Sequence, residues 1–135
     1  MPGFEFDLLV IGGGSGGVRT ARMAAQRGAR VALVEAGALG GTCVNVGCIP
    51  KKLYSYAAHY AEAFEESLGF GWEGPAPRLN WPRLKASRAR EISRLNGIYL
   101  QLLTNAGVQI IEGWAVLVDA HTVAVGGKHH NAKNI

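Results

Sequence analysis

Residues 6–35 read FDLLVIGGGSGGVRTARMAAQRGARVALVE, and this stretch decides the fold. The apolar run Phe6–Ile11 ends abruptly in glycines, which is typical of a strand buried in a parallel sheet. From residue 15 to residue 27 the apolar side chains fall on one helical stripe, and Gly28 ends the pattern. Val31–Val34 reads as a second buried strand. This order predicts a βαβ unit with a right-handed crossover, and so an α/β fold with a parallel sheet.

Two longer helices and a small β-meander are predicted for the rest of the chain. Apolar residues recur at three- and four-residue steps between Leu53 and Leu68, and the tyrosines and tryptophans on the helices are expected to lie mostly in the core. Asn80 is expected to cap the second helix, which ends at residues 105–107. Three short strands are predicted at residues 108–111, 115–118 and 122–125. Gly126–Asn134 reads as a weakly structured stretch.

Length and composition are those of one globular domain. The chain has 135 residues, of which 48% are hydrophobic and 18% are charged. Its formal net charge is +4, but the basic residues are spread over several segments, so we expect an anionic small molecule and no nucleic acid. The N-terminus lacks a basic leader, and the run Leu8–Ile11 is too short for a signal peptide or a membrane span. A cytoplasmic protein without membrane association is therefore expected.

The glycine turn between the first strand and the first helix has the spacing Gly-x-Gly-x-x-Gly. Gly12 permits the tight turn, Gly14 lets the backbone approach a pyrophosphate, and Gly17 allows the helix to pack closely on the strand. The helix N-terminus supplies N–H groups for phosphates, and Glu35 ends the second strand where an acid would accept ribose hydroxyls. The pattern predicts dinucleotide binding, but it does not separate FAD from NAD. A glycine turn without a ligand is the alternative.

The two cysteines, Cys43 and Cys48, lie five residues apart in the segment GGTCVNVGCIPKK. Five residues of regular helix rise about 7.5 Å along the axis, whereas the Cα atoms of a disulfide usually lie about 4.4–6.8 Å apart. A disulfide between them therefore requires a distorted backbone, which Gly47 and Pro50 favour.

Redox chemistry explains such a pair better than stability does, because a small ring constrains the unfolded chain only modestly. Lys51, Lys52 and a nearby helix N-terminus are expected to lower the pKa of a thiol and so to favour the nucleophilic thiolate. Two buried free cysteines and half of a metal site are the alternatives. No second cysteine pair and no nearby histidine is present, so no metal is expected.

The cysteine segment follows the glycine turn by about thirty residues, and in this arrangement the chain resembles the FAD-linked pyridine nucleotide–disulfide oxidoreductases. The resemblance covers essentially the whole chain, including residues 95–99 and 113–115. It implies a Rossmann-like FAD-binding domain. Because members of that family are several times longer, residues 1–135 are expected to be the N-terminal part of this domain, without the nicotinamide and dimer-interface domains.

The resemblance also implies roles for residues of the cysteine segment. Cys43 would be the interchange thiol that attacks the substrate disulfide, and Cys48 would lie against the flavin as the charge-transfer thiolate. Lys51 would sit beside flavin N5. The FAD contacts that it implies, beyond the glycines of the turn, are Ser15, Gly16, Glu35, Thr42, Cys43, Lys51 and Ala115.

Substrate contacts are implied on the first helix. Ser15, Arg19 and Arg22 follow one another at helical spacing and share a face. In glutathione reductases the position matching Arg22 binds a glutathione carboxylate, and those matching Ser15 and Tyr99 line the same pocket. Trypanothione reductases, whose substrate is cationic, replace both arginines, so the arginines here favour an anionic disulfide. A solvated basic face is the alternative.

The activity that the resemblance implies is the reduction of glutathione disulfide by NADPH in a homodimer, with the NADPH site in a domain outside these residues. Lys51-Lys52 after Pro50 is similar to glutathione and trypanothione reductases, whereas dihydrolipoamide dehydrogenases and mercuric reductases usually carry Ser-Lys there. A dihydrolipoamide dehydrogenase, another member of the family and a non-enzymatic remnant are the alternatives. The isolated piece is expected to be inactive. The histidines match no catalytic histidine of the family and are expected at the surface or in packing: His59, His121, His129 and His130.

Overall fold

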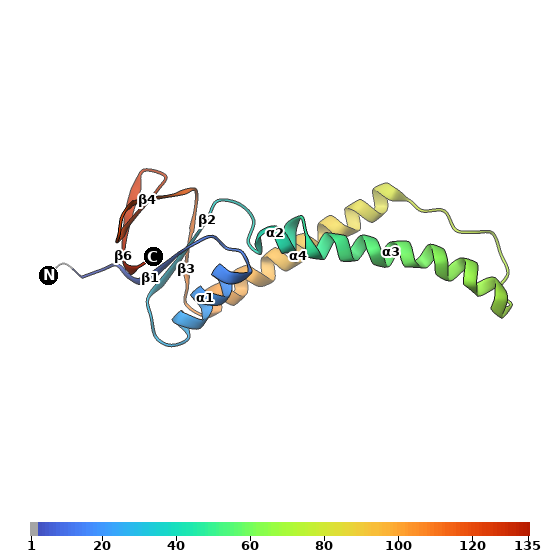
Figure 1. The fold of residues 1–135 in the computed structure, drawn as a ribbon, viewed down its shortest axis with the longest axis horizontal. Helices are drawn as coiled ribbons and strands as arrows, with labels where there is room; N and C mark the ends of the chain where they lie inside the picture. The colour runs from blue at the N-terminus through green and yellow to red at the C-terminus, as the bar shows by residue number, and fades with distance from the viewer. Residues whose placement is uncertain (1–2) are drawn as a thin grey trace.

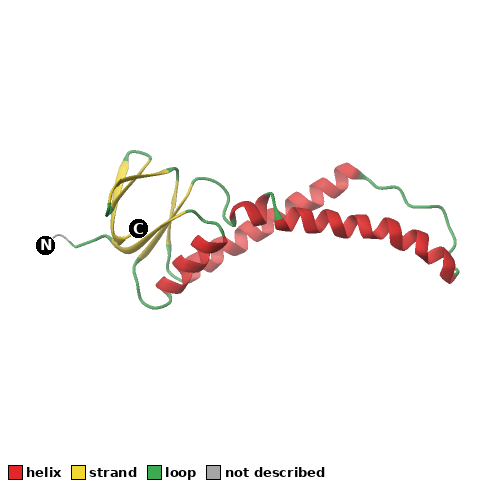
Figure 2. Ribbon diagram, viewed as in Figure 1, coloured by secondary structure: helices red, strands yellow, loops and turns green. Residues whose placement is uncertain are grey.

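The computed structural model describes residues 3–135 as an α/β fold, in which a sheet gathers at one end and two long helices run side by side away from it (Figure 1). A strand, a helix and a strand come first, three helices follow one another in the middle of the chain, and four strands form its last part (Figure 2). The elements are β1 Phe6–Ile11, α1 Ser15–Ala25, β2 Val31–Glu35, α2 Gly41–Asn45, α3 Cys48–Ser67, the 3-10 turn η1 Leu68–Phe70, α4 Trp81–Asn105, β3 Gln109–Glu112, β4 Ala115–Asp119, β5 Thr122–Val125 and β6 Lys128–Asn134.

The predicted βαβ unit is confirmed, since β1, α1 and β2 occur where the sequence pattern places them. The strand order across the sheet is β3-β2-β1-β6-β5-β4. β1 and β2 pair in parallel from Leu8 opposite Val31 to Ile11 opposite Val34. α1 ends at Ala25, two residues earlier than the pattern suggested, and Gly28 in the following turn has a φ of +90°. The first crossover therefore brings β2 beside β1.

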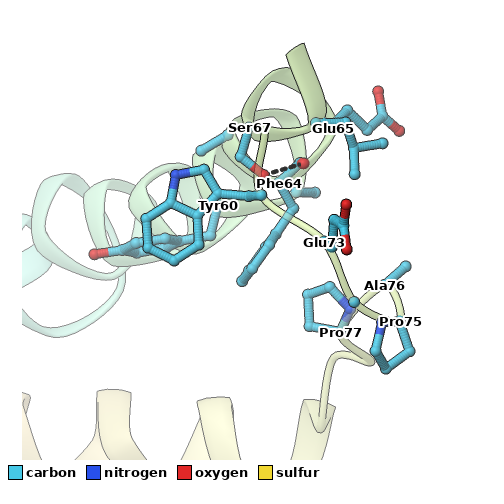
Figure 3. A pocket seen from close by; sticks show the side chains of 13 residues that line it. Tyr60, Phe64, Glu65, Ser67, Glu73, Pro75, Ala76 and Pro77 are labelled. Atoms are coloured by element: carbon cyan, nitrogen blue, oxygen red, sulfur yellow. Dashed lines mark hydrogen bonds between the residues drawn. The ribbon is translucent and has the colours of Figure 1, made fainter. Parts of the chain in front are cut away.

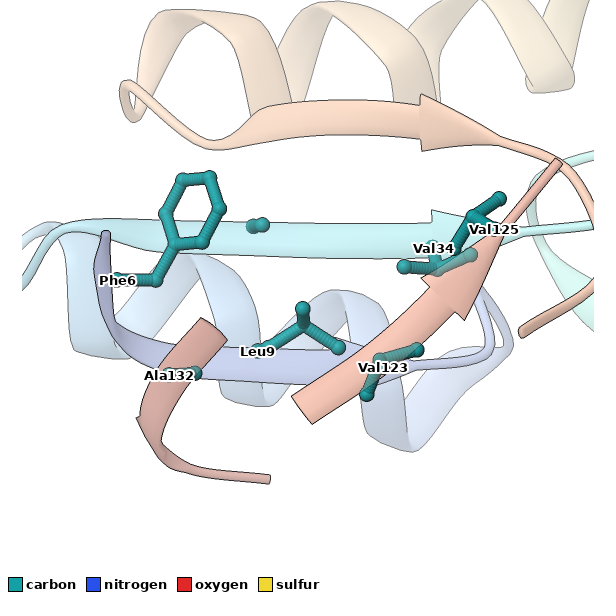
Figure 4. Close-up of a cluster of buried hydrophobic side chains, with 7 residues drawn as sticks. Phe6, Leu9, Val34, Val123, Val125 and Ala132 are labelled. Atoms are coloured by element: carbon teal, nitrogen blue, oxygen red, sulfur yellow. The ribbon is translucent and has the colours of Figure 1, made fainter. Parts of the chain in front are cut away.

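Every residue from Val31 to Val34 is buried, because both faces of the parallel sheet are covered. Side chains alternate along β2, so Val31 and Leu33 face a cluster that includes residues of α1 and α4. Ala32 and Val34 face the opposite way, toward the antiparallel strands (Figure 4). The second cluster consists of Phe6, Leu9, Ala32, Val34, Val123, Val125 and Ala132. The parallel sheet is thus the middle layer of three.

Two predictions for the last part of the chain are wrong. Residues 108–111 were expected in the meander, but β3 pairs in parallel with β2. α4 precedes β3 and returns the chain to the edge of the sheet as a crossover, as α1 does before β2. The stretch expected to be weakly structured forms β6, which pairs antiparallel with β5 and then in parallel with β1 through Ala132. The residues of β6 are mostly polar, so no apolar pattern in the sequence marks them as a strand. The strand forms because its backbone pairs with β5 and with β1. His129 and His130 therefore lie on a strand and not in a turn.

The helical hairpin of α3 and α4 contradicts the expectation that its aromatic residues are core. Tyr56, Tyr60 and Trp81 are 58%, 66% and 47% exposed. The hairpin has only two helices where it leaves the sheet, so each helix buries only the narrow seam that it shares with the other. Tyr54 and Trp81 mark that seam, with stacked rings whose centroids lie 5.3 Å apart. The Asn80 cap is confirmed, because its side chain accepts the backbone N–H of Arg83 at 3.0 Å.

None of the helices in residues 3–135 combines the length and the apolar character that crossing a bilayer requires.

The junction of β1 and α1 depends on two glycines. Gly12 has a φ of +101°, which only glycine adopts without strain. A Cβ built on Gly17 would collide with the carbonyl oxygen of Gly12. The helix therefore approaches the end of the strand as closely as backbone atoms allow, which is the role that the glycine spacing predicts.

Gly17→Ala should lower the free energy of unfolding by about 2 kcal/mol or more, because the new methyl group has no room beside backbone that cannot rotate away. Gly16→Ala is the matched control, since a Cβ on Gly16 meets nothing within 4 Å. That control should be neutral or stabilising by up to about 1 kcal/mol. Urea unfolding of both variants measures the difference, and equal midpoints would contradict the close approach.

Candidate functional site

The N-terminus of α1 is open toward a ligand. Gly14 is the residue before the helix, and α1 has neither a side-chain cap nor an acidic residue in its first turn. A Cβ on Gly14 would have only the Cα of Gly41 within 4 Å, at 3.9 Å. The described residues therefore give no packing reason for a glycine at this position. Free N–H groups beside an open cradle suit the phosphates of a dinucleotide, and Ser15 and Gly16 begin the helix at the same place.

Glu35 lies at the carboxyl end of β2, beside the glycine turn. Its carboxylate accepts the backbone N–H of Gly13 at 2.6 Å and that of Gly37 at 2.8 Å. Its backbone carbonyl accepts the N–H of Gly113 at 2.9 Å, which brings the chain leading to Ala115 to the same edge of the sheet. Ligands of open parallel sheets bind at the carboxyl ends of the strands. Glu35 and Ala115 thus converge where the predicted cofactor would lie, and their contacts with it stay predictions.

The cysteine segment is distorted as its spacing predicts. Cys43 lies in α2, the helix breaks at Val46, and α3 starts at Cys48. A Cβ on Gly47 would lie 3.0 Å from the carbonyl oxygen of Thr42 and 3.4 Å from the Cα of Cys43. Gly47 therefore permits the fold-back that brings the cysteines together. Both are free thiols in this structure, and the predicted disulfide between them stays a prediction.

The pKa of the Cys43 thiol is raised above its ordinary value, which corrects the expectation of a lowered one. A hydrogen bond with the Cys48 thiol is the largest cause, and loss of hydration and the nearby Cys48 charge add to it. The backbone N–H of Cys48 and the charge of Lys51 act in the opposite direction and do not outweigh it. The charge of Lys51 acts on Cys43 in the direction that the sequence predicts, but the hydrogen bond with the partner thiol has the larger effect on the pKa of Cys43.

The glycine turn and the cysteine segment touch through their backbones. The N–H of Gly40 donates to the carbonyl of Gly13 at 2.7 Å. A Cβ on Gly41 would lie 2.8 Å from the Cα of Gly14, and Gly41 has a φ of +63°. The predicted phosphate site and the helix that carries Cys43 therefore form one surface. The sequence predicted both motifs, but their contact is a result of the tertiary structure.

The residues predicted for the substrate follow the α1 helix. Ser15 is exposed at its start, Arg19 is exposed on the next turn, and Arg22 is half-buried in its last turn. Within the described part of the chain the Nε of Arg22 is buried without a hydrogen-bond partner. Tyr99 reaches α1 from α4, packing against the cluster that includes Val18. A cationic group that lacks a partner is suited to an anionic ligand.

Two asparagines in the site escaped the sequence interpretation. Asn45 lies between the cysteines, and Asn96 reaches it from α4, 51 residues later, with its side-chain Nδ2 at 3.0 Å from Asn45 Oδ1. The only signal for the first was its place in the cysteine segment. The signal for the second was its place in residues 95–99, where the chain resembles the family, but the helical pattern of α4 assigns Asn96 no role.

A cavity of about 520 Å³ lies far from these residues, at the tip of the helical hairpin (Figure 3). Tyr60, Phe64 and Pro77 are among the residues that line it. It contains none of the predicted site residues. The candidate site is therefore the open edge of the sheet at the glycine turn.

Comparison with known proteins identifies the family. Residues 6–135 match the family model described as pyridine nucleotide-disulphide oxidoreductase. The chain belongs to this family. Its relatives include the glutathione reductase of Burkholderia cepacia, which is 47% identical over all of this chain and 30% of its own length. The glutathione reductase of Nostoc sp. is 45% identical over 98% of this chain and 29% of its own length. The chloroplastic/mitochondrial glutathione reductase of Pisum sativum is 48% identical over 98% of this chain and 26% of its own length. The chain thus spans less than a third of these relatives.

Replacing Cys48 tests the cause of the raised pKa of Cys43. Cys48→Ala removes both the hydrogen bond and the neighbouring thiolate, so the pH at which Cys43 is half-maximally alkylated should fall. Iodoacetamide labelling across a pH series, under a phosphine reductant and with the modified peptide quantified by mass spectrometry, measures this midpoint. Cys48→Ser keeps a hydroxyl partner and should lower it less. A midpoint that stays unchanged or rises in Cys48→Ala would contradict the assignment.

Proposed function

We propose that these residues are the N-terminal part of the FAD-binding domain of an NADPH-dependent flavoprotein that reduces glutathione disulfide. The observation that carries the proposal is the contact between Gly14 and Gly41, which joins a dinucleotide turn to a pair of adjacent thiols. The alternative of an NAD dehydrogenase without thiol chemistry would not explain the cysteine pair. The names of the relatives support glutathione disulfide as the substrate.

The open cradle at Gly14 suits the FAD pyrophosphate, and Glu35 and the chain near Ala115 lie where the adenosine half would extend. FAD would supply the two electrons that open the protein disulfide, received from NADPH bound in a domain outside these residues. Lys51 lies in the first turn of α3, where its charge already acts on Cys43. These residues therefore bring a cofactor and a thiol pair to one surface.

The thiol exchange that we propose has two steps. Cys43 as thiolate attacks one sulfur of glutathione disulfide, the S–S bond of the substrate breaks, and the first glutathione leaves as a thiol after taking a proton. Cys48 as thiolate then attacks Cys43 in the mixed disulfide, which releases the second glutathione and closes the protein disulfide. Exposure alone would favour Cys48 as the first nucleophile, so the choice of Cys43 depends on the resemblance to the family.

The raised pKa of Cys43 has a consequence for the first step. Because the pKa of Cys43 is raised by its hydrogen bond with Cys48, forming the Cys43 thiolate is less favourable than for an ordinary cysteine, and a neighbouring base would promote this step. The four histidines of the chain do not lie beside the cysteines: His59 is eleven residues along α3 from Cys48, and the others belong to the antiparallel strands and the turn before β5. We therefore assign the base to a histidine from the domains that these residues lack, supplied across a homodimer. A reducing compartment such as the cytoplasm suits this chemistry.

Cys43→Ser in the full-length protein should abolish reduction of glutathione disulfide, because a serine hydroxyl cannot form the mixed disulfide. Flavin content should stay at the wild-type level, since the substitution removes one sulfur and leaves the glycine turn intact. NADPH oxidation at 340 nm and the flavin absorbance of the purified protein measure the two effects. Turnover at the wild-type rate would overturn the proposed function.

Arg22→Ala should raise the KM for glutathione disulfide about ten- to hundredfold with a small change in kcat, because a charge-assisted hydrogen bond contributes about 1.5–3 kcal/mol. Arg27→Ala is the control, since Arg27 is exposed beyond the end of α1 and bonds only the carbonyl of Met23 among the described residues. Steady-state kinetics with varied glutathione disulfide compare the two variants. Equal KM values for the two variants would contradict substrate binding by Arg22 and would favour the alternative, a solvated basic face on α1.

A further inference from the structure

A network of side-chain amides connects α4 to the segment between the two cysteines. Asn96 donates through Nδ2 to the carbonyl of Leu39 at 2.7 Å and to Oδ1 of Asn45 at 3.0 Å. Asn45 in turn donates through Nδ2 to the carbonyl oxygens of Gly41 at 2.9 Å and Leu39 at 3.2 Å. Both asparagines are half-buried. The turn before α2, α2 itself and the distant helix α4 are thus linked by two side chains.

The α2 helix needs such support because its own sequence does not stabilise it. It has five residues, fewer than an isolated helix requires to persist in water. Gly40, the residue before the helix, has a φ of +102° and provides no side-chain cap. Gly41, the first residue of the helix, has a φ of +63°. Glycines adopt these conformations readily, but they also leave the unfolded and the partly open states many alternatives. Packing and the asparagine amides therefore have to hold α2 in place.

Cys43 is affected directly by the position of α2. It lies two residues before Asn45 on the same short helix, whereas Cys48 begins α3, a helix of twenty residues. Cys43, which lies on the shorter of the two helices, is thus the thiol closer in the chain to Asn45 and its hydrogen bonds. A shift of α2 would change the distance between the sulfurs without unfolding α3 or the sheet.

We propose that Asn96 is a positioning residue for the cysteine pair, which holds α2 through Asn45 and so sets the equilibrium between the dithiol and the disulfide. The inference rests on the thiol chemistry proposed above for Cys43 and Cys48. Asn96 touches neither sulfur and acts through the backbone of the turn and through Asn45.

The physical reason is the effective concentration of one thiol at the other. Oxidation by glutathione disulfide forms the Cys43–Cys48 bond, breaks the disulfide of the reagent, and transfers two electrons and two protons to give two glutathione thiols. When α2 is held, the thiols meet without a further loss of conformational freedom, which favours the protein disulfide. When α2 is loosened, closing the bond must also order the helix. The equilibrium then shifts toward the dithiol.

The test is the equilibrium constant of the pair in glutathione redox buffers, measured on the full chain by mass spectrometry after acid quenching and alkylation. Asn96→Asp keeps the shape of the side chain and removes both N–H donors, and Asn96→Ala removes the whole amide. Each should lower the equilibrium constant for disulfide formation about tenfold, equal to an upward shift of about 30 mV in reduction potential. Asn45→Ala together with Asn96→Ala should change it no more than the single substitutions do, because they break one network.

Ser93→Ala is the control, because Ser93 is exposed on α4 three residues before Asn96. Its equilibrium constant should equal that of the wild type. Circular dichroism and urea unfolding establish that each variant is folded, and Asn96→Asp and Asn45→Ala carry the comparison if Asn96→Ala does not fold. Folded variants with a wild-type equilibrium constant would overturn the role of Asn96 alone. A wild-type chain that forms no Cys43–Cys48 disulfide at any buffer composition would instead overturn the proposed function.

Discussion

The candidate site depends on a contact between two stretches of backbone that carry no side chains. Gly14 follows β1 and Gly41 begins α2, and they lie so close that a methyl group on Gly41 would overlap the Cα of Gly14. The Gly40 N–H and the Gly13 carbonyl fix the same approach with a hydrogen bond of 2.7 Å. Because the glycine turn and the helix that carries Cys43 meet directly, a dinucleotide bound at the turn would lie beside the thiols.

Hydrogen bonds from three polar side chains offset the conformational freedom of the glycines that make this contact. Glycines make the close approach possible, but they contribute no packing and lose more conformational entropy on folding than other residues do. Glu35 accepts the backbone N–H of Gly13 in the glycine turn and that of Gly37 after β2. Asn45 and Asn96 bond backbone carbonyls at the start of the cysteine segment and of Leu39 just before it, and they bond each other. Glu35 and Asn96 lie outside the backbone that they order, on a strand and on a long helix, whereas Asn45 belongs to α2 itself and bonds the carbonyl of its first residue.

The long helices illustrate where pattern and environment separate. Residues of the candidate site lie at the beginning of α3, which carries Cys48, and in the second half of α4, which carries Asn96 and Tyr99. Helical periodicity predicted both helices because it is a local property. It also suggested buried aromatics, but Tyr60 remains 66% exposed because a two-helix hairpin offers no third layer to cover it. Periodicity shows which residues share a face, and it does not show whether anything packs on that face.

The sequence alone determined the βαβ unit, the glycine turn, the distortion between the cysteines and the Asn80 cap, because each depends on the pattern of residues within one continuous segment of the chain. Only the tertiary structure decided that β3 joins the parallel sheet and that the polar stretch after residue 126 becomes β6, since strand pairing depends on distant partners. It also decided the raised pKa of Cys43 and the reach of Asn96 to the cysteine segment. Local patterns specify what a segment can form, whereas contacts across 50 or more residues, such as that of Asn96 with Asn45, exist only once the chain has folded.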